Sequence, residues 1–319
     1  MSTAIEVQGV SKRYGDNLAV NDISFAVPTG SLCGFLGPNG AGKSTTIRMI
    51  MSIIYPDAGT ILARGGSALD SKDRIGYLPE ERGVYRKMRV AEFLGYIARL
   101  KGIDARSSRR LAEDWLERME LPGVARKRCQ ELSKGMQQKV QFIATIMHDP
   151  ELIILDEPFS GLDPVNANLL GRVINELNEE GRTIIFSTHV LHQAERICDR
   201  VLMINQGSIV LDDTMDGLRR TFDPSTILLR SAEPVKKLIA ESKSLPGVVE
   251  ITHPRDDEHT AEILLTRTEG RMDRIPPDLI ARLSELTALE SLELRRPTLD
   301  DVFVSLVGTS ISEAEDAEA

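Results

Sequence analysis

The sequence predicts an α/β domain with a parallel sheet, followed by a smaller α+β domain. Two apolar runs without alternation, at residues 152–158 and 183–189, have the length and composition of strands buried on both faces. Helical segments separate these runs, which is the order expected for an α/β layer structure. Near residues 221–225 the pattern changes to short strands and short helices. The length of 319 residues also corresponds to about two domains.

The composition excludes several broad classes of protein. Charged residues make up 27% and apolar residues 41% of the chain, unlike a disordered, collagen-like or integral membrane protein. Aromatic residues make up only 4%, so the core must be mainly aliphatic. No apolar run approaches the length of about 18 residues that a membrane-spanning helix needs, and the N-terminus has no signal-peptide pattern. We therefore expect a chain that does not cross a membrane itself.

The net charge and the cysteine content indicate which partners and which cellular compartment to expect. The formal net charge is −9, whereas a nucleic-acid binder usually carries a basic face, so no nucleic-acid partner is expected. The three cysteines are widely spaced and form no CxxC pair. This pattern fits a reducing, cytoplasmic location and argues against a disulfide framework. Cys33 lies in an apolar run and is expected to be a buried, inert thiol.

The first 120 residues contain the clearest local patterns. Alternating apolar residues on either side of Gly15-Asp16 predict a pair of antiparallel strands within residues 5–27. An apolar strand at 31–36, a glycine-rich loop and a helix from Lys43 follow. Residues 90–120 are expected to be helical, because Leu111, Trp115, Leu116 and Met119 recur on one face. Trp115 is expected to be a core residue.

The second domain is expected to have a ferredoxin-like order. Strands are predicted at 226–230, 246–252, 261–267 and 289–295, and helices at 233–243 and 276–287. This is the β-α-β-β-α-β order of that fold. A closing helix is predicted at 297–308, and the acidic stretch 309–319 is expected to be a disordered tail. His253 and His259 flank an acidic turn, for which a metal site and a solvated hairpin loop are the two interpretations.

A phosphate-binding loop provides the first chemical motif. Residues Gly37, Pro38, Asn39, Gly40, Ala41, Gly42, Lys43 and Ser44 match G-x-x-x-x-G-K-[ST]. Glycines let backbone N–H groups approach phosphates, and the following helix adds its positive N-terminal end. Lys43 would reach the β- and γ-phosphates, and the hydroxyl of Ser44 would bind Mg²⁺. The strand before the loop and the helix after it are the context that this motif requires.

Two adjacent carboxylates end the strand at 152–158. Asp156 can reach the Mg²⁺ ion, as an acidic residue does in P-loop enzymes. Glu157 can orient a water molecule for attack on the γ-phosphorus. The alternative is that the two acids cap a following helix, but their occurrence together with a P-loop favours the catalytic interpretation.

The segment Leu132-Ser133-Lys134-Gly135-Met136 lies between these two motifs. Together the three motifs resemble those of the ATP-binding subunit of an ABC transporter, and the resemblance covers about residues 4–220. The resemblance implies an ABC cassette, a P-loop NTPase fold with an antiparallel β subdomain and a helical subdomain at about 86–135. It also implies that Ser133, Gly135 and Met136 belong to the family signature, whose Ser and Gly contact the γ-phosphate held by a second subunit. The alternative role of Ser133 is a helix N-cap. The assigned domains are thus 1–220, 221–308 as an accessory domain, and the tail at 309–319.

The resemblance assigns further residues. His189 matches the switch histidine and is expected to contact the γ-phosphate. Asp163 matches the D-loop at the dimer interface, and its alternative role is to cap a helix before Pro164. Tyr14 matches the aromatic residue that stacks on adenine, although an ordinary surface tyrosine is the competing interpretation. Thr45 completes the nucleotide-binding set.

One position departs from the family pattern. Glu80 stands where the family's Q-loop has a glutamine that contacts Mg²⁺. A carboxylate can also bind Mg²⁺, so Glu80 is expected to bind both nucleotide and metal. The segment around Glu80, the altered signature and the C-terminal residues 297–303 together resemble the type-2 exporter subgroup, which includes sodium-efflux and drug-efflux subunits.

These assignments predict an ATPase that uses ATP and Mg²⁺ and powers separate membrane permease subunits from the inner face of the cell membrane. One P-loop and one signature imply that a second cassette, identical or paralogous, completes each site in a head-to-tail pair. The alternatives are a soluble ABC ATPase that acts on the ribosome or DNA, and a regulatory protein that binds ATP without hydrolysing it. The sequence has no sustained heptads and no second cassette, which argues against the soluble ATPase. The presence of Glu157 and His189 argues against the regulatory protein.

Overall fold

The computed structural model describes residues 2–81, 83–221, 226–240, 245, 247–252, 257–265, 275–295 and 298–307. The chain divides into two compact units, Met1–Met215 and Asp216–Ala319. The division falls at the start of α7 (Met215–Thr221), a few residues before the boundary predicted at 220–221. None of the helices in the described ranges is both long and apolar enough to span a membrane.

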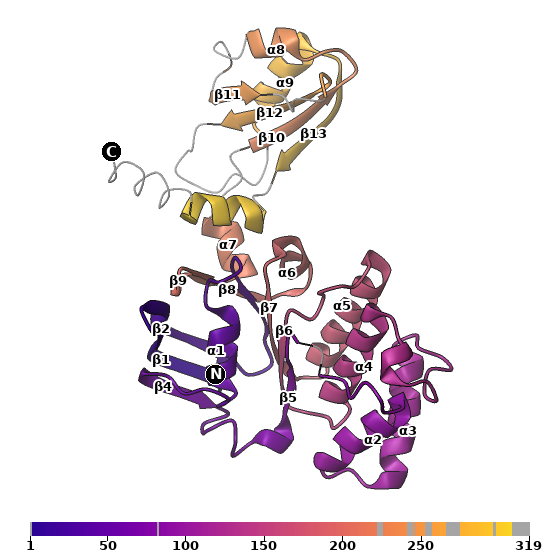
Figure 1. Ribbon diagram of the computed structural model, residues 1–319. Coiled ribbons are helices and arrows are strands. Elements are labelled where there is room, and N and C mark those ends of the chain that lie inside the picture. Colours follow the sequence, from indigo (N-terminus) through magenta and orange to yellow (C-terminus); the bar gives the residue numbers. More distant parts are fainter. Residues whose placement is uncertain are drawn as a thin grey trace. The chain divides into compact units, whose positions relative to one another are not determined.

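A six-stranded sheet forms the centre of the first unit (Figure 1). Its strand order is β5-β6-β7-β3-β8-β9, and every neighbouring pair is parallel except β8–β9. All residues of the three central strands β3, β6 and β7 are buried, which confirms the prediction of parallel strands covered on both faces. The strands are β3 (Leu32–Leu36), β5 (Ile75–Leu78), β6 (Leu152–Asp156), β7 (Thr183–Thr188), β8 (Arg200–Asn205) and β9 (Ser208–Thr214).

A separate antiparallel sheet lies beside it, with the order β2-β1-β4. Its strands are β1 (Thr3–Tyr14), β2 (Asn17–Pro28) and β4 (Ala58–Ala63), and β1 pairs with β2 across the predicted turn, with Tyr14 opposite Asn17. The sheet shares one core with α1 (Lys43–Ile50) and the central strands. Within that core the rings of Phe25 and Phe35 are 5.8 Å apart. This packing fixes the base of the glycine-rich loop, which lies between β3 and α1.

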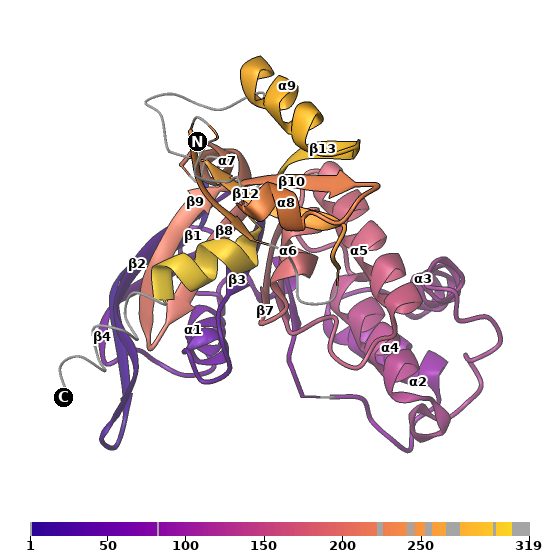
Figure 2. The same ribbon diagram turned by 90° about the horizontal axis from the view of Figure 1, so that it is seen from above.

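The helices α2 to α4 lie on the opposite side of the central sheet from β1, β2 and β4 in both views (Figures 1 and 2). The helical prediction for residues 90–120 is confirmed as two helices, which Gly102 (φ +84°) separates, and Asp104 caps the second. Trp115 is only half-buried, and the Arg118 guanidinium lies 4.6 Å from its ring centroid. Besides α1, this unit contains the helices α2 (Val90–Leu100), α3 (Ala105–Arg118), α4 (Lys134–Ile146), α5 (Pro164–Glu179) and α6 (Leu191–Ile197).

The second unit has a four-stranded antiparallel sheet of order β11-β12-β10-β13. With helices after its first and third strands, this is the β-α-β-β-α-β arrangement, and residues 299–307 form a further helix. The elements are β10 (Thr226–Ser231), α8 (Lys236–Ala240), β11 (Val248–Thr252), β12 (Thr260–Leu265), α9 (Pro277–Leu286) and β13 (Leu289–Arg295). His259 contacts the backbone oxygen of Ser231. His253 and the tail at 309–319 lie outside the described residues.

Candidate active site

The glycine-rich loop leaves β3 and enters α1, and close packing explains two of its glycines. A Cβ atom on Gly37 would lie 2.2 Å from the Ile204 oxygen, and one on Gly42 would lie 2.5 Å from the Ala19 oxygen. Gly42 also has φ +108°, a conformation that glycine adopts without strain. The turn between β8 and β9 supports the loop, because Gly207 N–H donates to the Ala41 oxygen over 3.0 Å. The first turn of α1 is thereby held rigidly, with Lys43, Ser44 and Thr45 at its start.

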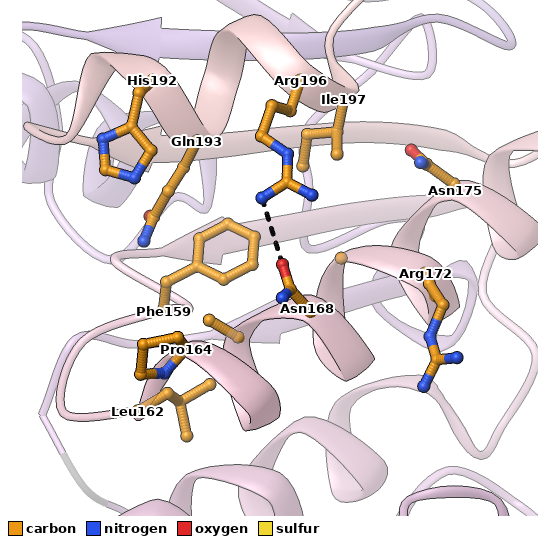
Figure 3. Close-up of a pocket in the computed structure, with 12 residues that line it drawn as sticks. Phe159, Leu162, Pro164, Asn168, Arg172, Asn175, His192, Gln193, Arg196 and Ile197 are labelled. Atoms are coloured by element: carbon orange, nitrogen blue, oxygen red, sulfur yellow. Dashed lines mark hydrogen bonds between the residues drawn. The ribbon is translucent and has the colours of Figure 1, made fainter.

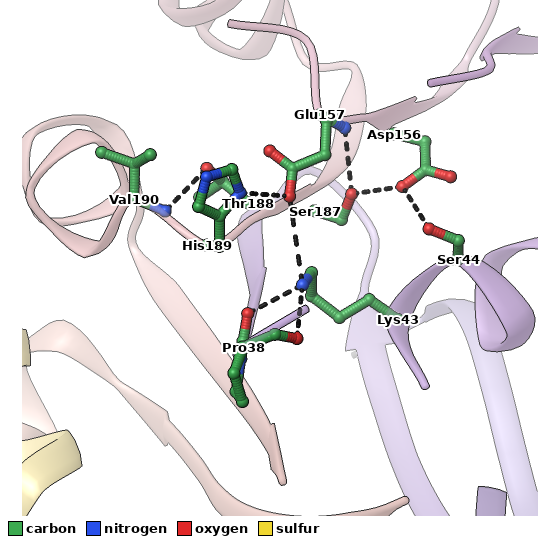
Figure 4. A network of polar contacts seen from close by, with 10 residues as sticks. Pro38, Lys43, Ser44, Asp156, Glu157, Ser187, Thr188, His189 and Val190 are labelled. Atoms are coloured by element: carbon green, nitrogen blue, oxygen red, sulfur yellow. Dashed lines mark hydrogen bonds and ion pairs between the residues drawn. The ribbon is translucent and has the colours of Figure 1, made fainter. Parts of the chain in front are cut away.

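Lys43 is a buried cation inside this loop (Figure 4). Its Nζ donates to the backbone oxygens of Gly37 (2.7 Å) and Pro38 (3.0 Å) and lies 3.9 Å from Oε1 of Glu157. Burial lowers the pKa of Lys43 below its ordinary value, and the negative charges of Glu157, Asp156 and Glu80 oppose that shift. A buried ammonium group held by backbone oxygens of the loop is suited to binding an anionic phosphate group.

Asp156 lies at the end of β6 and is fully buried. Its Oδ1 accepts hydrogen bonds from Ser187 Oγ (2.5 Å) and Ser44 Oγ (3.2 Å). Its Oδ2 is buried and has no hydrogen-bond partner in the structure. Unpaired buried carboxylate oxygens are costly, and a carboxylate beside a hydroxyl group is a ligand set that Mg²⁺ accepts. Asp156 and Ser44 therefore fit the metal site that the sequence predicted.

No group of three or more His, Cys, Asp or Glu side chains within the described ranges could hold a metal ion by itself. A Mg²⁺ ion at a phosphate-transfer site needs only one or two protein carboxylates, because substrate phosphates and water supply the rest. The site at Asp156 is compatible with a Mg²⁺ ion that phosphates and water also coordinate.

Glu157 and His189 form a close pair beside Lys43 (Figure 4). Nδ1 of His189 lies 2.9 Å from Oε1 of Glu157, and a carboxylate can only accept, so the imidazole donates. Glu157 has a positive φ of 49°, an uncommon conformation for a residue with a side chain, and such strain clusters at functional sites. The strained turn places the carboxylate next to the Lys43 ammonium group and the His189 imidazole.

Ser187 is a residue whose role the sequence did not reveal. Its hydroxyl donates to Asp156 and accepts the backbone N–H of Glu157 over 3.0 Å. Ser187 stands opposite Asp156 in the parallel pairing of β6 and β7. The register of β6 and β7 brings Ser187 next to Asp156. In the sequence, the one indication of this role was a hydroxyl group on a buried strand expected to neighbour β6.

The signature and D-loop residues form a second group. Ser133, Gly135, Met136 and Asp163 line a shallow cavity of about 520 Å³. Both alternative capping roles are present, since Ser133 accepts the Met136 N–H at the start of α4 and Asp163 accepts two N–H groups at the start of α5. Hydrogen bonds from Asn166 hold the pKa of Asp163 below its usual range. A Cβ on Gly135 would lie 3.4 Å from Leu162, so the two motifs pack together.

The remaining predicted residues are exposed to differing degrees. Tyr14 ends β1 with 49% of its surface exposed, and Nζ of Lys12 lies 5.7 Å from its ring centroid. Asn39, Gly40 and Glu80 are exposed, whereas Thr45 is half-buried. Glu80 follows β5, and its charge acts on the pKa of Lys43, which places its carboxylate within electrostatic reach of the loop. Burial raises the pKa of the Cys33 thiol, in line with the inert role expected for it.

A cavity of about 400 Å³ lies behind the D-loop, between α5 and α6 (Figure 3). Phe159, Leu162 and Pro164 form its apolar end, and Arg196 donates to Asn168 over 3.1 Å across it. None of the catalytic candidates lines this cavity. It is a half-open groove between two helices that follow the candidate site.

The sequence model of the family described as ABC transporter matches residues 20–160, which include the P-loop, the signature and Asp156-Glu157. The chain is 35% identical to the uncharacterized ABC transporter ATP-binding protein YhaQ of Bacillus subtilis, over 95% of this chain and 98% of that protein. It is 34% identical to the Nod factor export ATP-binding protein I of Burkholderia orbicola, over 98% of this chain and 100% of that protein.

A solved structure agrees with these sequence relatives. It is described as the ATP binding subunit of an ABC transporter, and it has a TM-score of 0.64 and 33% identity over 69% of this chain and 93% of its own length. The relatives therefore span nearly the whole sequence, and the fold of the first unit is shared. The chain belongs to the family of ABC transporter ATP-binding proteins, whose members bind and hydrolyse ATP.

Proposed function

We propose that this chain is the ATPase subunit of an exporter, that it uses MgATP, and that it powers separate membrane-spanning subunits. The observation that carries the proposal is the polar network of Lys43, Ser44, Asp156, Ser187, Glu157 and His189 at the glycine-rich loop. Each group has the chemistry that phosphoryl transfer needs, which is mainly positioning and charge stabilisation.

Ser44, Asp156 and Glu80 are the residues that would hold Mg²⁺. When bound, the ion would neutralise charge on the β- and γ-phosphates. Lys43 and the N–H groups at the start of α1 would bind the phosphates, and Tyr14 would offer its exposed ring to adenine. These residues lie at the end of β1, at the start of α1, after β5 and at the end of β6. One nucleotide would therefore contact elements of both sheets of the first unit.

Glu157 is the proposed general base. Its carboxylate would orient and polarise the attacking water, and His189 would hold that carboxylate in place and contact the γ-phosphate. The 2.9 Å contact between them supports this division of roles. Geometry of this kind is the first requirement for a base, ahead of its pKa.

A head-to-tail dimer would complete the site. Ser133 and Gly135 surround their own cavity with Asp163, while the phosphate-binding residues form a separate network. In a head-to-tail pair, the signature group of one subunit would contact the γ-phosphate held by its partner, and two ATP molecules would lie between them. The partner cassette would be a second copy of this chain or a paralogue.

Export is the proposed direction of transport. The relative from Burkholderia orbicola is named as an export protein and aligns over 98% of this chain and 100% of its own length. The second unit is part of that alignment, which supports membership in the exporter subgroup. The proposal places the chain in the cytoplasm, at the inner face of the cell membrane.

Co-purification tests the proposal. A tagged copy of the chain is isolated from native membranes after solubilisation in mild detergent, and the bound proteins are identified. A stoichiometric polytopic membrane protein is the expected partner. Recovery only from the soluble fraction, with ribosomal proteins or DNA, would contradict the transporter role while leaving the nucleotide site intact.

A further inference from the structure

The buried side chain of Gln141 bonds to the first part of the segment between β5 and α2. Gln141 on α4 is 5% exposed. Its Nε2 donates to the backbone oxygens of Pro79 (3.3 Å) and Glu81 (3.1 Å), and its Oε1 accepts the N–H of Gly83 (3.2 Å). The amide therefore uses both donor hydrogens and its acceptor on one stretch of backbone.

The next turn of α4 continues this attachment. Thr145 Oγ1 lies 3.3 Å from the Tyr77 oxygen on β5 and 3.0 Å from the Gln141 oxygen. Gly76 packs closely here as well, since a Cβ on it would lie 2.4 Å from the Thr145 oxygen. One face of α4 is thus bonded to the end of β5 and to the segment after it.

Glu80 lies between the bonded groups. The oxygens of Pro79 and Glu81 flank it, and both accept from Gln141. Its own side chain is exposed, yet its charge acts on Lys43 in the glycine-rich loop. Gln141 therefore anchors the backbone on both sides of Glu80.

We propose that Gln141 is a positioning residue, which holds Glu80 toward the nucleotide and its metal ion by fixing the backbone on both sides of it. The inference rests on the proposed role of Glu80. Gln141 itself is buried away from the loop and would not touch ATP. Its effect on hydrolysis would pass through Glu80 alone.

Amide hydrogen exchange tests the attachment without relying on activity. In Gln141→Met the side-chain volume is kept and all three hydrogen bonds are lost. The released groups belong to an exposed segment, where water can replace their partners, so the variant is expected to fold. The Gly83 amide should exchange about fivefold to tenfold faster than in the wild type. Unchanged Gly83 exchange would overturn the proposal.

Gly83→Ala is the matched control for that measurement. Its new Cβ would lie 3.8 Å from Nε2 of Gln141, an ordinary contact, and its N–H remains available to Oε1. Exchange in the segment should stay within about twofold of the wild type in this variant. Acceleration equal to that in Gln141→Met would show that the segment opens on any change and would count against the attachment.

A double-mutant cycle with Glu80→Ala tests the consequence for hydrolysis. Gln141→Met should lower kcat about threefold to tenfold when Glu80 is present, and less than about twofold when it is absent. Equal losses in both backgrounds would show a merely structural role and overturn the proposal. Failure of the wild type to hydrolyse ATP would instead contradict the proposed function, while the exchange result would still decide whether Gln141 holds the segment.

Discussion

Oε1 of Glu157 lies 2.9 Å from Nδ1 of His189 and 3.9 Å from Nζ of Lys43, so one carboxylate oxygen faces two nitrogen donors (Figure 4). Glu157 follows Asp156 directly, yet the two carboxylates have different partners. Asp156 is bonded to two hydroxyl groups, whereas Glu157 faces an imidazole and an ammonium group. The positive φ at Glu157 turns its side chain away from the direction that a continued strand would give. Adjacent acids can thereby serve a metal ion and a water molecule separately.

Glu157→Gln should abolish turnover and leave nucleotide binding intact. The amide keeps the shape and a hydrogen-bond acceptor for His189, but it cannot act as a base. We expect kcat to fall at least about 100-fold, while the Kd for ATP changes less than about threefold. ATP hydrolysis and fluorescent-nucleotide binding measure the two quantities, and size-exclusion chromatography with ATP should show the dimer accumulating.

Glu179→Gln makes the same chemical change at an exposed position on α5 and should leave kcat unchanged. Wild-type turnover in Glu157→Gln would remove Glu157 from its role as base.

Ser187→Ala should weaken both stability and catalysis. The hydroxyl is buried and joins Asp156 to the backbone of Glu157, so its loss leaves the Glu157 N–H without a partner. We expect a loss of about 1–2 kcal/mol in the free energy of unfolding and a fall of about tenfold in kcat/KM. Urea denaturation and steady-state kinetics measure these changes.

Thr183→Val is the comparison variant for Ser187→Ala. Thr183 is buried at the other end of β7, where its hydroxyl accepts the Gly30 N–H over 2.9 Å. Its replacement should lower stability by a similar amount with kcat/KM unchanged. If both variants lost activity equally, the effect of Ser187 would come from β7 stability and not from the site.

Local motifs made much of the first unit predictable. The glycine-rich loop, the buried strands β3, β6 and β7, and the caps of α4 and α5 each depend on a few consecutive residues, and the structure has them where the sequence indicated. The strands β4, β5, β8 and β9 were not predicted. Two of them illustrate the reason, since β4 contains Ala58 and Gly59 and β5 has only four residues, so neither has a strong local strand signal.

Contacts between residues far apart in the sequence limit how much of the candidate site can be predicted. Ser187 reaches Asp156 through the register of β6 and β7, and Gln141 reaches Gly83 across 58 positions of sequence. Strand order and helix packing create these contacts, and neither is contained in a local pattern. Residues that hold catalytic groups in place are therefore harder to find than the catalytic groups themselves.

His148 should make the protein less stable in mild acid. Burial first, and the positive charge of Lys101 second, lower the pKa of His148 from 6.5 to about 4. Its Nε2 lies 3.3 Å from the Ile75 oxygen, and its buried Nδ1 has no partner. The unfolded chain therefore takes up a proton between pH 6.5 and about 4 that the folded chain does not. Stability falls as the pH falls through this window, by up to about 2 kcal/mol after allowance for partial exposure.

Urea denaturation at several pH values measures this effect. His148→Gln keeps a donor for the Ile75 oxygen and has no titrating group, so its stability should depend less on pH between 6.5 and about 4. His192→Gln, at an exposed position on α6, should retain the wild-type dependence. Identical pH profiles for His148→Gln and the wild type would assign the acid sensitivity to other groups.

Gly171→Ala should stabilise the first unit, and Gly76→Ala should destabilise it. Gly171 lies within α5 and lines the cavity toward α6, where a Cβ would meet Ile197 at 3.9 Å, an ordinary contact. Alanine in a helix interior is favoured over glycine by about 1 kcal/mol, which raises Tm by about 2–4 °C in a domain of this size. A Cβ on Gly76 would lie 2.4 Å from the Thr145 oxygen, so this strand must shift or strain. Calorimetry of the two variants should give Tm shifts of opposite sign, and a lowered Tm in Gly171→Ala would mean that α5 and α6 pack more tightly than the cavity between them indicates.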